Sequence, residues 1–378
     1  MTNAHNFILN KLKDRVDNGS LRRLSTSSPP IDFCSNDYLG FARSEELRKA
    51  IYKETTNLPL ANNGSGGSRL LSGNTQYIEE TELHVAKFHK AEAGLIFNSG
   101  YDANIGLLSS LGQKGDTFLC DELIHASLID GVRLTHANRY TFRHNDLQHL
   151  EEKLKLCKGI VYVIVESVYS MDGDIAPLLE ISTICQLYNA NLIVDEAHAT
   201  GIFGERGQGL VYALNLEEQV FARVVTFGKA IGCHGAIVLG SKTLREYLIN
   251  FARSFIYTTA APIHSIISIS CAYHLLENQN HADEINSKIN HFARLISVYN
   301  LTAVKPSLSA IQGISVAGNL RAKKASGILQ AQGFDVRPIL SPTVPLGKER
   351  IRICLHTYNT NEDIENLIRA IKELTTNE

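Results

Sequence analysis

The sequence predicts an α/β protein with a mostly parallel, seven-stranded central sheet, followed by a smaller α+β C-terminal domain. From about residue 45 to 260, short apolar runs alternate with helical patterns, as expected for parallel strands joined by crossover helices. Two of these runs end at Asp195-Glu196-Ala197-His198 and at Thr226-Phe227-Gly228-Lys229. Because ligands bind where the strands of open α/β sheets end, we expect a carboxylate and a lysine at one ligand-binding edge.

Three regions follow from the patterns along the chain. Residues 1–44 are expected to form an amphipathic helix and an arm, residues 45–265 a large domain, and residues 266–378 a small domain that begins with a long helical stretch over 266–299. The strands expected in the large domain are 95–97, 117–120, 139–142, 160–165, 191–194, 223–227 and 236–239. In the small domain we expect strands over 310–316 and 351–355 and helices over 320–332 and 361–374.

Composition excludes several classes of protein. With 37 basic and 39 acidic residues, the net charge of −2 offers no basic surface for nucleic acid or an anionic membrane. No apolar run approaches the roughly 18 residues that could span a bilayer. The seven cysteines contain no Cys-x-x-Cys pair, which argues against a zinc ribbon or a thioredoxin-type site. An odd cysteine count without a signal peptide indicates a cytoplasmic protein.

Lys229 and Asp195 together suggest pyridoxal phosphate chemistry. A lysine amine can form a Schiff base with the cofactor's aldehyde, and a carboxylate can pair with its protonated ring nitrogen. Lys229 could instead be an ordinary surface lysine, but it follows a strand and a glycine, where a ligand can approach closely. A desolvated lysine at this point would act as an amine nucleophile.

Further segments fit the same chemistry, although each has a simpler structural explanation. Gly100 and Tyr101 follow an expected strand and open a helix, whose free N–H groups suit a phosphate, as would Thr226, but such turns are usually only structural. His125 could stack on the cofactor ring, whereas a lone histidine is more often a core or surface residue. Ser170, after the most apolar strand, could reach the phenolic oxygen of the ring.

Three other hypotheses receive little support. The glycine-rich segment 62–69 is neither a Walker A loop nor a G-x-G-x-x-G fingerprint, and it serves equally well as a flexible loop or as backbone close to a cofactor or second subunit. Asp195-Glu196-Ala197-His198 spells a helicase box, but the phosphate loop and basic surface that a helicase needs are missing. Asp195 and His198 alone are too few ligands for a metal, so no metal site is expected.

Taken in order, these segments resemble the α-oxoamine synthases, which are fold-type I enzymes dependent on pyridoxal phosphate. The resemblance spans residues 33 to 345. It rests on segments 33–40, 64–69, 124–127, 167–174, 195–201, 226–229 and 342–345.

The resemblance implies a role for each of several residues. Lys229 would be the Schiff-base lysine and Asp195 the partner of the ring nitrogen, while His125 would stack on the ring. Ring substituents would contact His198 and Ser170, and the phosphate would contact Gly100, Tyr101 and Thr226. Thr258 and Thr259 would reach the phosphate of the partner in a homodimer with sites at the interface. The expected substrate contacts are Arg22, Asn36, Thr343 and Arg352, with Arg352 binding the amino acid carboxylate.

The implied reaction joins an amino acid to an acyl thioester with loss of carbon dioxide. The branch of the family in biotin biosynthesis, which uses L-alanine and a pimeloyl thioester, is the expected one, and a glycine C-acetyltransferase is the alternative. Members of that branch often carry arginine just before a Pro-Pro-Thr-Val-Pro stretch, where this chain reads Leu340-Ser341-Pro342-Thr343, so the acyl chain stays open. A catalytically idle relative of the fold would require loss of residues that are all present here.

Overall fold

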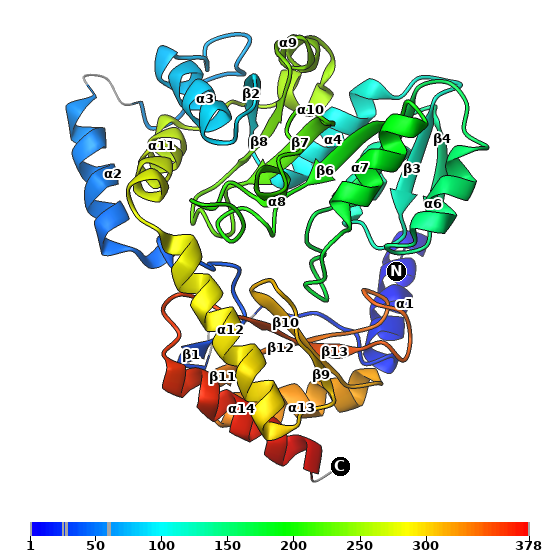
Figure 1. The fold of residues 1–378 in the computed structure, drawn as a ribbon, viewed down its shortest axis with the longest axis vertical. Coiled ribbons are helices and arrows are strands. Elements are labelled where there is room, and N and C mark those ends of the chain that lie inside the picture. Colours follow the sequence, from blue (N-terminus) through cyan, green and yellow to red (C-terminus); the bar gives the residue numbers. More distant parts are fainter. Residues whose placement is uncertain (1, 25, 27–28, 59–61, 377–378) are drawn as a thin grey trace. The chain divides into compact units, whose positions relative to one another are not determined.

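The structure, a computed structural model, describes residues 2–24, 26, 29–58 and 62–376 and falls into two compact units (Figure 1). The larger unit comprises Asn36–Ser170 and Asp174–Asn286, and the smaller one comprises Met1–Ser35, Met171–Gly173 and Ser287–Glu378. The expected borders at 44/45 and 265/266 therefore differ from those of the units. Residues up to 286 group with the large unit because helix α11 (Ile263–Asn278) packs against α2 (Glu45–Asn57) and α3 (Gln76–Phe88).

The large unit is built on a seven-stranded sheet, and all seven predicted strands are present. Its spatial order is β2-β8-β7-β6-β5-β3-β4, and β8 alone runs antiparallel to both of its neighbours. The mostly parallel sheet predicted from the sequence is therefore confirmed. The strands are β2 (Ala93–Phe97), β3 (Thr117–Asp121), β4 (Asn138–Phe142), β5 (Val161–Glu166), β6 (Asn191–Asp195), β7 (Val220–Thr226) and β8 (Ala236–Gly240).

Helices cover both faces of this sheet, with α7 in front and α4 behind in the view of Figure 1. The apolar runs were recognisable because strands covered on both faces carry few polar residues, and every residue of β5 is buried. The remaining helical segments of this unit are η1 (Phe41–Arg43), α4 (Gly100–Leu111), α5 (Ala126–Arg133), α6 (Leu147–Leu154), α7 (Leu178–Leu187), α8 (Leu210–Ala213), α9 (Lys242–Phe251) and α10 (Arg253–Ile256).

The small unit is α+β, as predicted. An antiparallel sheet of order β12-β13-β10-β9 and a two-stranded parallel pair of β1 with β11 carry its strands. Helix α13 packs against β11, β12, β13 and α14. The elements are α1 (Asn3–Asp17), β1 (Ile31–Asp32), β9 (Val304–Lys305), β10 (Ile311–Ser315), α13 (Asn319–Ala331), β11 (Phe334–Asp335), β12 (Arg337–Ile339), β13 (Arg350–Cys354) and α14 (Asn361–Thr376).

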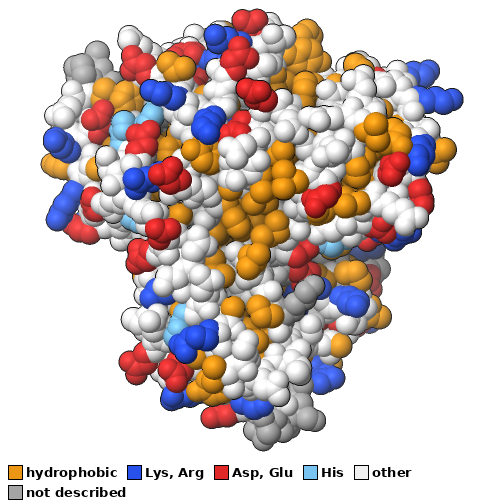
Figure 2. Space-filling view, viewed as in Figure 1, with side chains coloured by type: hydrophobic (Ala, Val, Ile, Leu, Met, Phe, Trp, Pro, Cys, Tyr) orange, Lys and Arg blue, Asp and Glu red, His pale blue; other side chains and the backbone are white. Residues whose placement is uncertain are grey.

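The predicted continuous helical stretch 266–299 is wrong, because two helices occupy it. Helix α11 ends at Asn278, Gln279 is extended with φ −132° and ψ 149°, and α12 (His281–Tyr299) follows. No glycine or proline marks this break. Within the described part of the chain, no helix combines the length and the apolar character needed to cross a membrane. On the face shown in Figure 2, acidic and basic side chains are interspersed, as the balanced composition suggests.

One buried ionic cluster ties α3, β2 and α9 together. The carboxylate of Glu82, which is 2% exposed, accepts hydrogen bonds from Arg69 Nη1 at 2.7 Å, from Arg245 Nη2 at 2.8 Å and from the backbone N–H of Ile96 at 2.8 Å. Removal of one partner from such a cluster leaves the remaining charges buried without compensation.

We therefore expect Glu82→Ala to destabilise the protein by about 3–5 kcal/mol, because both guanidinium groups lose their buried carboxylate and keep only the part-exposed carboxylate of Glu79. Thermal and urea unfolding would measure the loss. Glu80→Ala is the matched control, because Glu80 is exposed on the same helix and accepts a hydrogen bond from the exposed Gln76. Equal unfolding midpoints for the two variants would contradict the role given to this cluster.

Candidate active site

The carboxyl ends of four parallel strands place polar side chains along one edge of the large sheet. Asp121 ends β3, Glu166 ends β5, Asp195 ends β6 and Thr226 ends β7, and all four are buried. The register pairs Glu166 with Asp195 and Asp195 with Val224, so the edge is continuous across these strands. Ligands of open α/β sheets bind at this kind of edge.

Two hydrogen bonds hold the carboxylate of Asp195. Its Oδ1 accepts the backbone N–H of Ala197 at 2.9 Å, and its Oδ2 accepts a side-chain N–H of Asn104 at 2.9 Å. Hydrogen bonds of this kind stabilise an ionised carboxylate. Because a carboxylate has about four acceptor sites, Asp195 can also accept a protonated ring nitrogen.

Lys229 ends a chain of four hydrogen-bonded side chains. The hydroxyl of Tyr38 donates to Asn36 Oδ1 at 3.1 Å, and it lies 2.7 Å from His198 Nδ1. Because the hydroxyl proton is used on Asn36, the hydroxyl accepts from His198 Nδ1–H. The other nitrogen, Nε2, then offers its lone pair to the Lys229 amine, 2.6 Å away. This series of hydrogen bonds thus fixes the tautomer of His198 and orients the Lys229 amine.

His125 precedes helix α5 and acts as its N-cap. Its Nδ1 accepts the backbone N–H of Ser127 at 3.2 Å and lies 2.7 Å from the Ser127 hydroxyl. Burial by surrounding protein lowers the pKa of His125; Asp195 and Asp130 oppose this shift, and Lys229 reinforces it. The imidazole is therefore neutral at physiological pH, while its side chain stays open to solvent and able to stack on a ligand.

The start of helix α4 forms a cradle beside β7. Ser99 caps the helix, and a Cβ added to Gly100 would lie 3.3 Å from Thr226 Oγ1, so the glycine keeps this approach open. The free N–H groups of the first turn and the Thr226 hydroxyl suit a phosphate. Tyr101 is exposed, and its hydroxyl donates to Asp130 at 2.7 Å. Its predicted phosphate contact stays a prediction.

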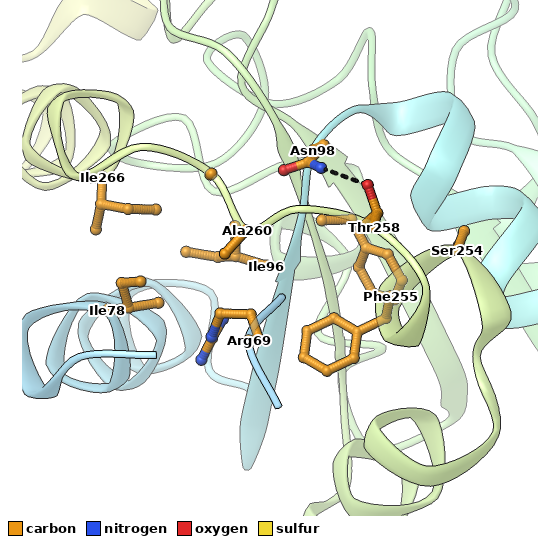
Figure 3. Close-up of a pocket in the computed structure, with 11 residues that line it drawn as sticks. Arg69, Ile78, Ile96, Asn98, Ser254, Phe255, Thr258, Ala260 and Ile266 are labelled. Carbon is orange, nitrogen blue, oxygen red and sulfur yellow. Dashed lines mark hydrogen bonds between the residues drawn. The ribbon is translucent and has the colours of Figure 1, made fainter. Parts of the chain in front are cut away.

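Thr258 and Thr259 lie next to this cradle. The Asn98 amide, one residue before Ser99, donates to Thr258 Oγ1 at 3.2 Å and to the Thr259 carbonyl at 2.8 Å. Figure 3 shows Asn98 and Thr258 pointing toward one another at the rim of a small pocket. The structure therefore joins both threonines to the end of β2, while their proposed role toward a partner subunit stays a prediction.

Ser170 lies in a segment that is anchored by an ionic cluster. His144 bonds Asp121 through Nδ1 at 3.0 Å and Asp174 through Nε2, and its ring packs edge-on against Tyr169. Burial alone would lower the pKa of His144, but the two carboxylates outweigh it and raise the pKa to about 9. The charged imidazolium therefore fixes the chain on both sides of Ser170.

The predicted substrate contacts fall in both units. Asn36 belongs to the large unit and accepts from Tyr38, as described above. Arg22, Thr343 and Arg352 belong to the small unit. There, Arg22 Nη2 donates to Thr343 Oγ1 at 3.2 Å, while Arg352 lies on β13 with its Nη1 3.0 Å from Cys354 Sγ. The structure brings the first two of these three together.

Among the described residues, one further group could in principle ligate a metal. His84 of α3 and His274 and Glu277 of α11 offer ligand atoms within 4.8 Å of one another. Glu277 instead pairs with His84 at 2.9 Å and His274 at 3.6 Å, as a surface ion pair would. Sequence spacing alone does not reveal this group, because His84 lies far from His274 and Glu277 in the chain.

Comparison with known proteins decides the family. The model of the family described as aminotransferase class I and II matches residues 28–371. The chain belongs to this family. An 8-amino-7-oxononanoate synthase of Emericella nidulans is 41% identical over 96% of this chain and 93% of its own length. The aminoacyl transferase sphA of Byssochlamys spectabilis is 38% identical over 90% of this chain and 80% of its own length. The solved 8-amino-7-oxononanoate synthase of Francisella tularensis superposes with a TM-score of 0.79 at 29% identity. The match covers 93% of this chain and 99% of that structure's chain.

Pyridoxal phosphate is the cofactor of aminotransferase class I and II proteins, and the residues of this chain fit it. Asp195 has acceptor capacity for the ring nitrogen, and Lys229 provides the amine. Gly100 leaves space beside Thr226 for a phosphate. The expected fold class and cofactor are thus confirmed, while the contact of each single residue with the cofactor stays a prediction.

Four residues of this edge were missed by the sequence analysis as functional candidates. Tyr38, Asn104 and Ser127 form the hydrogen bonds just described, and Glu166 is fully enclosed, which raises its pKa well above the ordinary range. Tyr38 lies two residues after Asn36 in a segment that carries the family resemblance, so that signal was available. Asn104 and Ser127 look like ordinary helix residues until the fold brings them together.

The His144 cluster predicts a pH-dependent stability. Its pKa of about 9 exceeds the usual 6.5, so unfolding releases a proton above pH 6.5. The stabilisation, on the order of 2–3 kcal/mol, is complete below pH 6.5 and is lost as pH rises through 9. We expect the wild-type melting temperature to fall over this window and that of His144→Gln to fall less. Exposed His136→Gln should behave like wild type, and parallel profiles for all three would contradict the assignment.

Lys229→Ala should abolish covalent attachment of the cofactor, because it removes the amine that His198 holds at this edge. Borohydride reduction followed by peptide mass spectrometry would detect the attachment in the wild type, on the peptide with Lys229, and not in the variant. The visible absorption and the turnover should disappear together. Lys242→Ala, an exposed lysine at the start of α9, serves as the control. Cofactor found on another lysine would refute the role of Lys229.

Proposed function

We propose that this protein condenses L-alanine with a pimeloyl thioester, carried by coenzyme A or a carrier protein, to form 8-amino-7-oxononanoate in biotin biosynthesis. Carbon dioxide and the free thiol are the other products. The observation that carries this proposal is the nearly full-length match to curated relatives of that name, combined with Lys229, Asp195 and His125 at one sheet edge.

In the proposed reaction, each residue at the edge has a defined task. When bound, pyridoxal phosphate supplies an electron sink for the α-carbon of the amino acid. Asp195 holds the proton on the ring nitrogen, and His125 offers a neutral surface for stacking. Lys229, held by His198, removes the α-proton and later returns one to the product. His198 and Ser170 orient the ring, while Gly100, Tyr101 and Thr226 bind the phosphate.

Four residues are proposed to contact the substrates. Arg352 would bind the amino acid carboxylate, because a guanidinium pairs with a carboxylate through two parallel hydrogen bonds. Arg22, Thr343 and Asn36 would contact the remainder of the substrates. The Arg22–Thr343 hydrogen bond supports the joint action of these two residues.

A second candidate function is another α-oxoamine synthase, such as glycine C-acetyltransferase. Leu340 stands where members of the biotin branch often carry arginine, and this leucine removes one means of binding the terminal carboxylate of a pimeloyl chain. Similarity to an aminoacyl transferase, at 38% identity, also leaves a different acyl donor open.

Assembly and location are part of the proposal. We infer a homodimer with active sites at the interface, in which Thr258 and Thr259 reach the phosphate in the partner. We also infer a cytoplasmic location, and in support none of the seven cysteines forms a disulfide, as in a reducing compartment. Light scattering coupled to gel filtration would give the mass, and a monomer of 41.7 kDa with full activity would refute the shared site.

Product formation with two substrate pairs tests the reaction. Cofactor-loaded protein is given L-alanine with pimeloyl-CoA, or glycine with acetyl-CoA, and mass spectrometry identifies the amino ketone. We expect the first pair to react faster, with one carbon dioxide and one thiol released per product. Faster reaction with the second pair would instead establish the alternative function and show that Leu340 marks a different acyl pocket.

A further inference from the structure

Two buried side chains connect Asp195 to His125. Asn104 of α4 is 2% exposed and Ser127 of α5 is 1% exposed. Asn104 Nδ2 donates to Asp195 Oδ2 at 2.9 Å and to Ser127 Oγ at 2.9 Å, and Ser127 Oγ lies 2.7 Å from His125 Nδ1. Helices α4 and α5 pack closely on one another, which brings these positions together.

The orientation of the Asn104 amide follows from its partners. Both amide hydrogens are used, one on the Asp195 carboxylate and one on Ser127, while Oδ1 is buried without a hydrogen-bond partner among the described residues. The reverse orientation would set a carbonyl oxygen against the Asp195 carboxylate and lose the hydrogen bond between them. A buried amide with an unpaired oxygen costs free energy, so this arrangement persists only because its two N–H bonds are strong.

The orientation of Asn104 determines, through the Ser127 hydroxyl, which tautomer His125 adopts. Its oxygen accepts from Asn104, so its own proton is directed to His125 Nδ1. The backbone N–H of Ser127 donates to the same nitrogen at 3.2 Å. With two donors aimed at it, Nδ1 carries no proton, and the imidazole proton resides on Nε2. Protonation of Nδ1 would break both bonds.

We propose that Asn104 and Ser127 are positioning residues that hold the Asp195 carboxylate in place and lock His125 as the neutral Nε2–H tautomer. They couple the group that pairs with the ring nitrogen to the group that stacks on the ring. A neutral imidazole places no positive charge over the protonated ring. It therefore does not favour loss of the ring-nitrogen proton that Asp195 holds. The inference rests on the proposed cofactor roles of these two residues.

Two equilibrium measurements on purified protein test the coupling without relying on turnover. Dissociation constants of pyridoxal phosphate are determined by fluorescence, and the His125 tautomer is read from two-bond 15N–1H correlations of histidine-labelled protein, with and without cofactor. His125→Gln identifies the signal. Asp195, Lys229, Asp130 and Glu166 are the charged or titratable groups close to this region, so spectra are compared at one fixed pH.

We expect Asn104→Ala to weaken cofactor binding by about 10- to 100-fold, because a bond to a charged acceptor is lost. Ser127→Ala should release the tautomer, seen as partial protonation of Nδ1, and Ser127→Thr should restore it by keeping the hydroxyl. Asn191→Ala at the opposite end of β6 and Ser110→Ala on α4 are the controls. They remove comparable amide and hydroxyl hydrogen bonds away from the bonds that link Asp195 to His125, and they should leave both readouts unchanged.

A wild-type His125 signal with a proton on Nδ1 would overturn the inference, as would an unchanged tautomer in Ser127→Ala. If Asn104→Ala does not fold, the two Ser127 variants still decide the question. These outcomes are separate from the proposed function. A wild-type protein that binds no pyridoxal phosphate refutes the proposed function. The His125 tautomer of the cofactor-free protein still tests the hydrogen bonds that link Asp195 to His125.

Discussion

The buried carboxylate of Asp195 is the constraint on which the site depends. An unpaired charge at the end of a covered strand would cost several kcal/mol, so the fold must supply donors before any ligand arrives. One donor is the backbone of Ala197 in the turn after β6, and the other is Asn104 on a crossover helix. The carboxylate thus fixes the position of α4 relative to the sheet, and α4 also supplies the phosphate cradle at its first turn.

A second requirement is that the reactive amine be aimed at the same edge. Lys229 follows β7, whereas His198 follows β6, and their contact spans two adjacent strand ends. Tyr38, which is fully buried, sets the tautomer of this histidine from a segment far away in sequence. The same logic recurs at His125, where Ser127 supplies the proton. In both places a neutral hydroxyl lies within hydrogen-bond distance of a histidine Nδ1.

The strands and the family could be predicted because each depends on local pattern. Covered strands are nearly continuous apolar runs; Asp195 is the last residue of β6, and Lys229 lies shortly after the end of β7. Asn104 and Ser127 could not be predicted, since their roles exist only once α4 packs on α5. The break at Gln279 was invisible as well, because glutamine is a good helix former and tertiary packing overrides its preference. The borders of the two units likewise depend on packing of α11 rather than on composition.

The distribution of candidate residues between the units offers a physical reason for variation in acyl donor among related proteins. Every candidate contact to the cofactor belongs to the large unit, where hydrogen bonds link Asp195, His125, His198 and Lys229 to buried partners. Arg352, Thr343 and Leu340 belong to the small unit. A change at Leu340 therefore breaks none of the bonds that hold the reactive groups, whereas a change at Asn104 breaks two. Substrate choice can accordingly diverge at low cost to the chemistry, which is why the identity of the acyl chain must be decided by substrates and not by the cofactor residues.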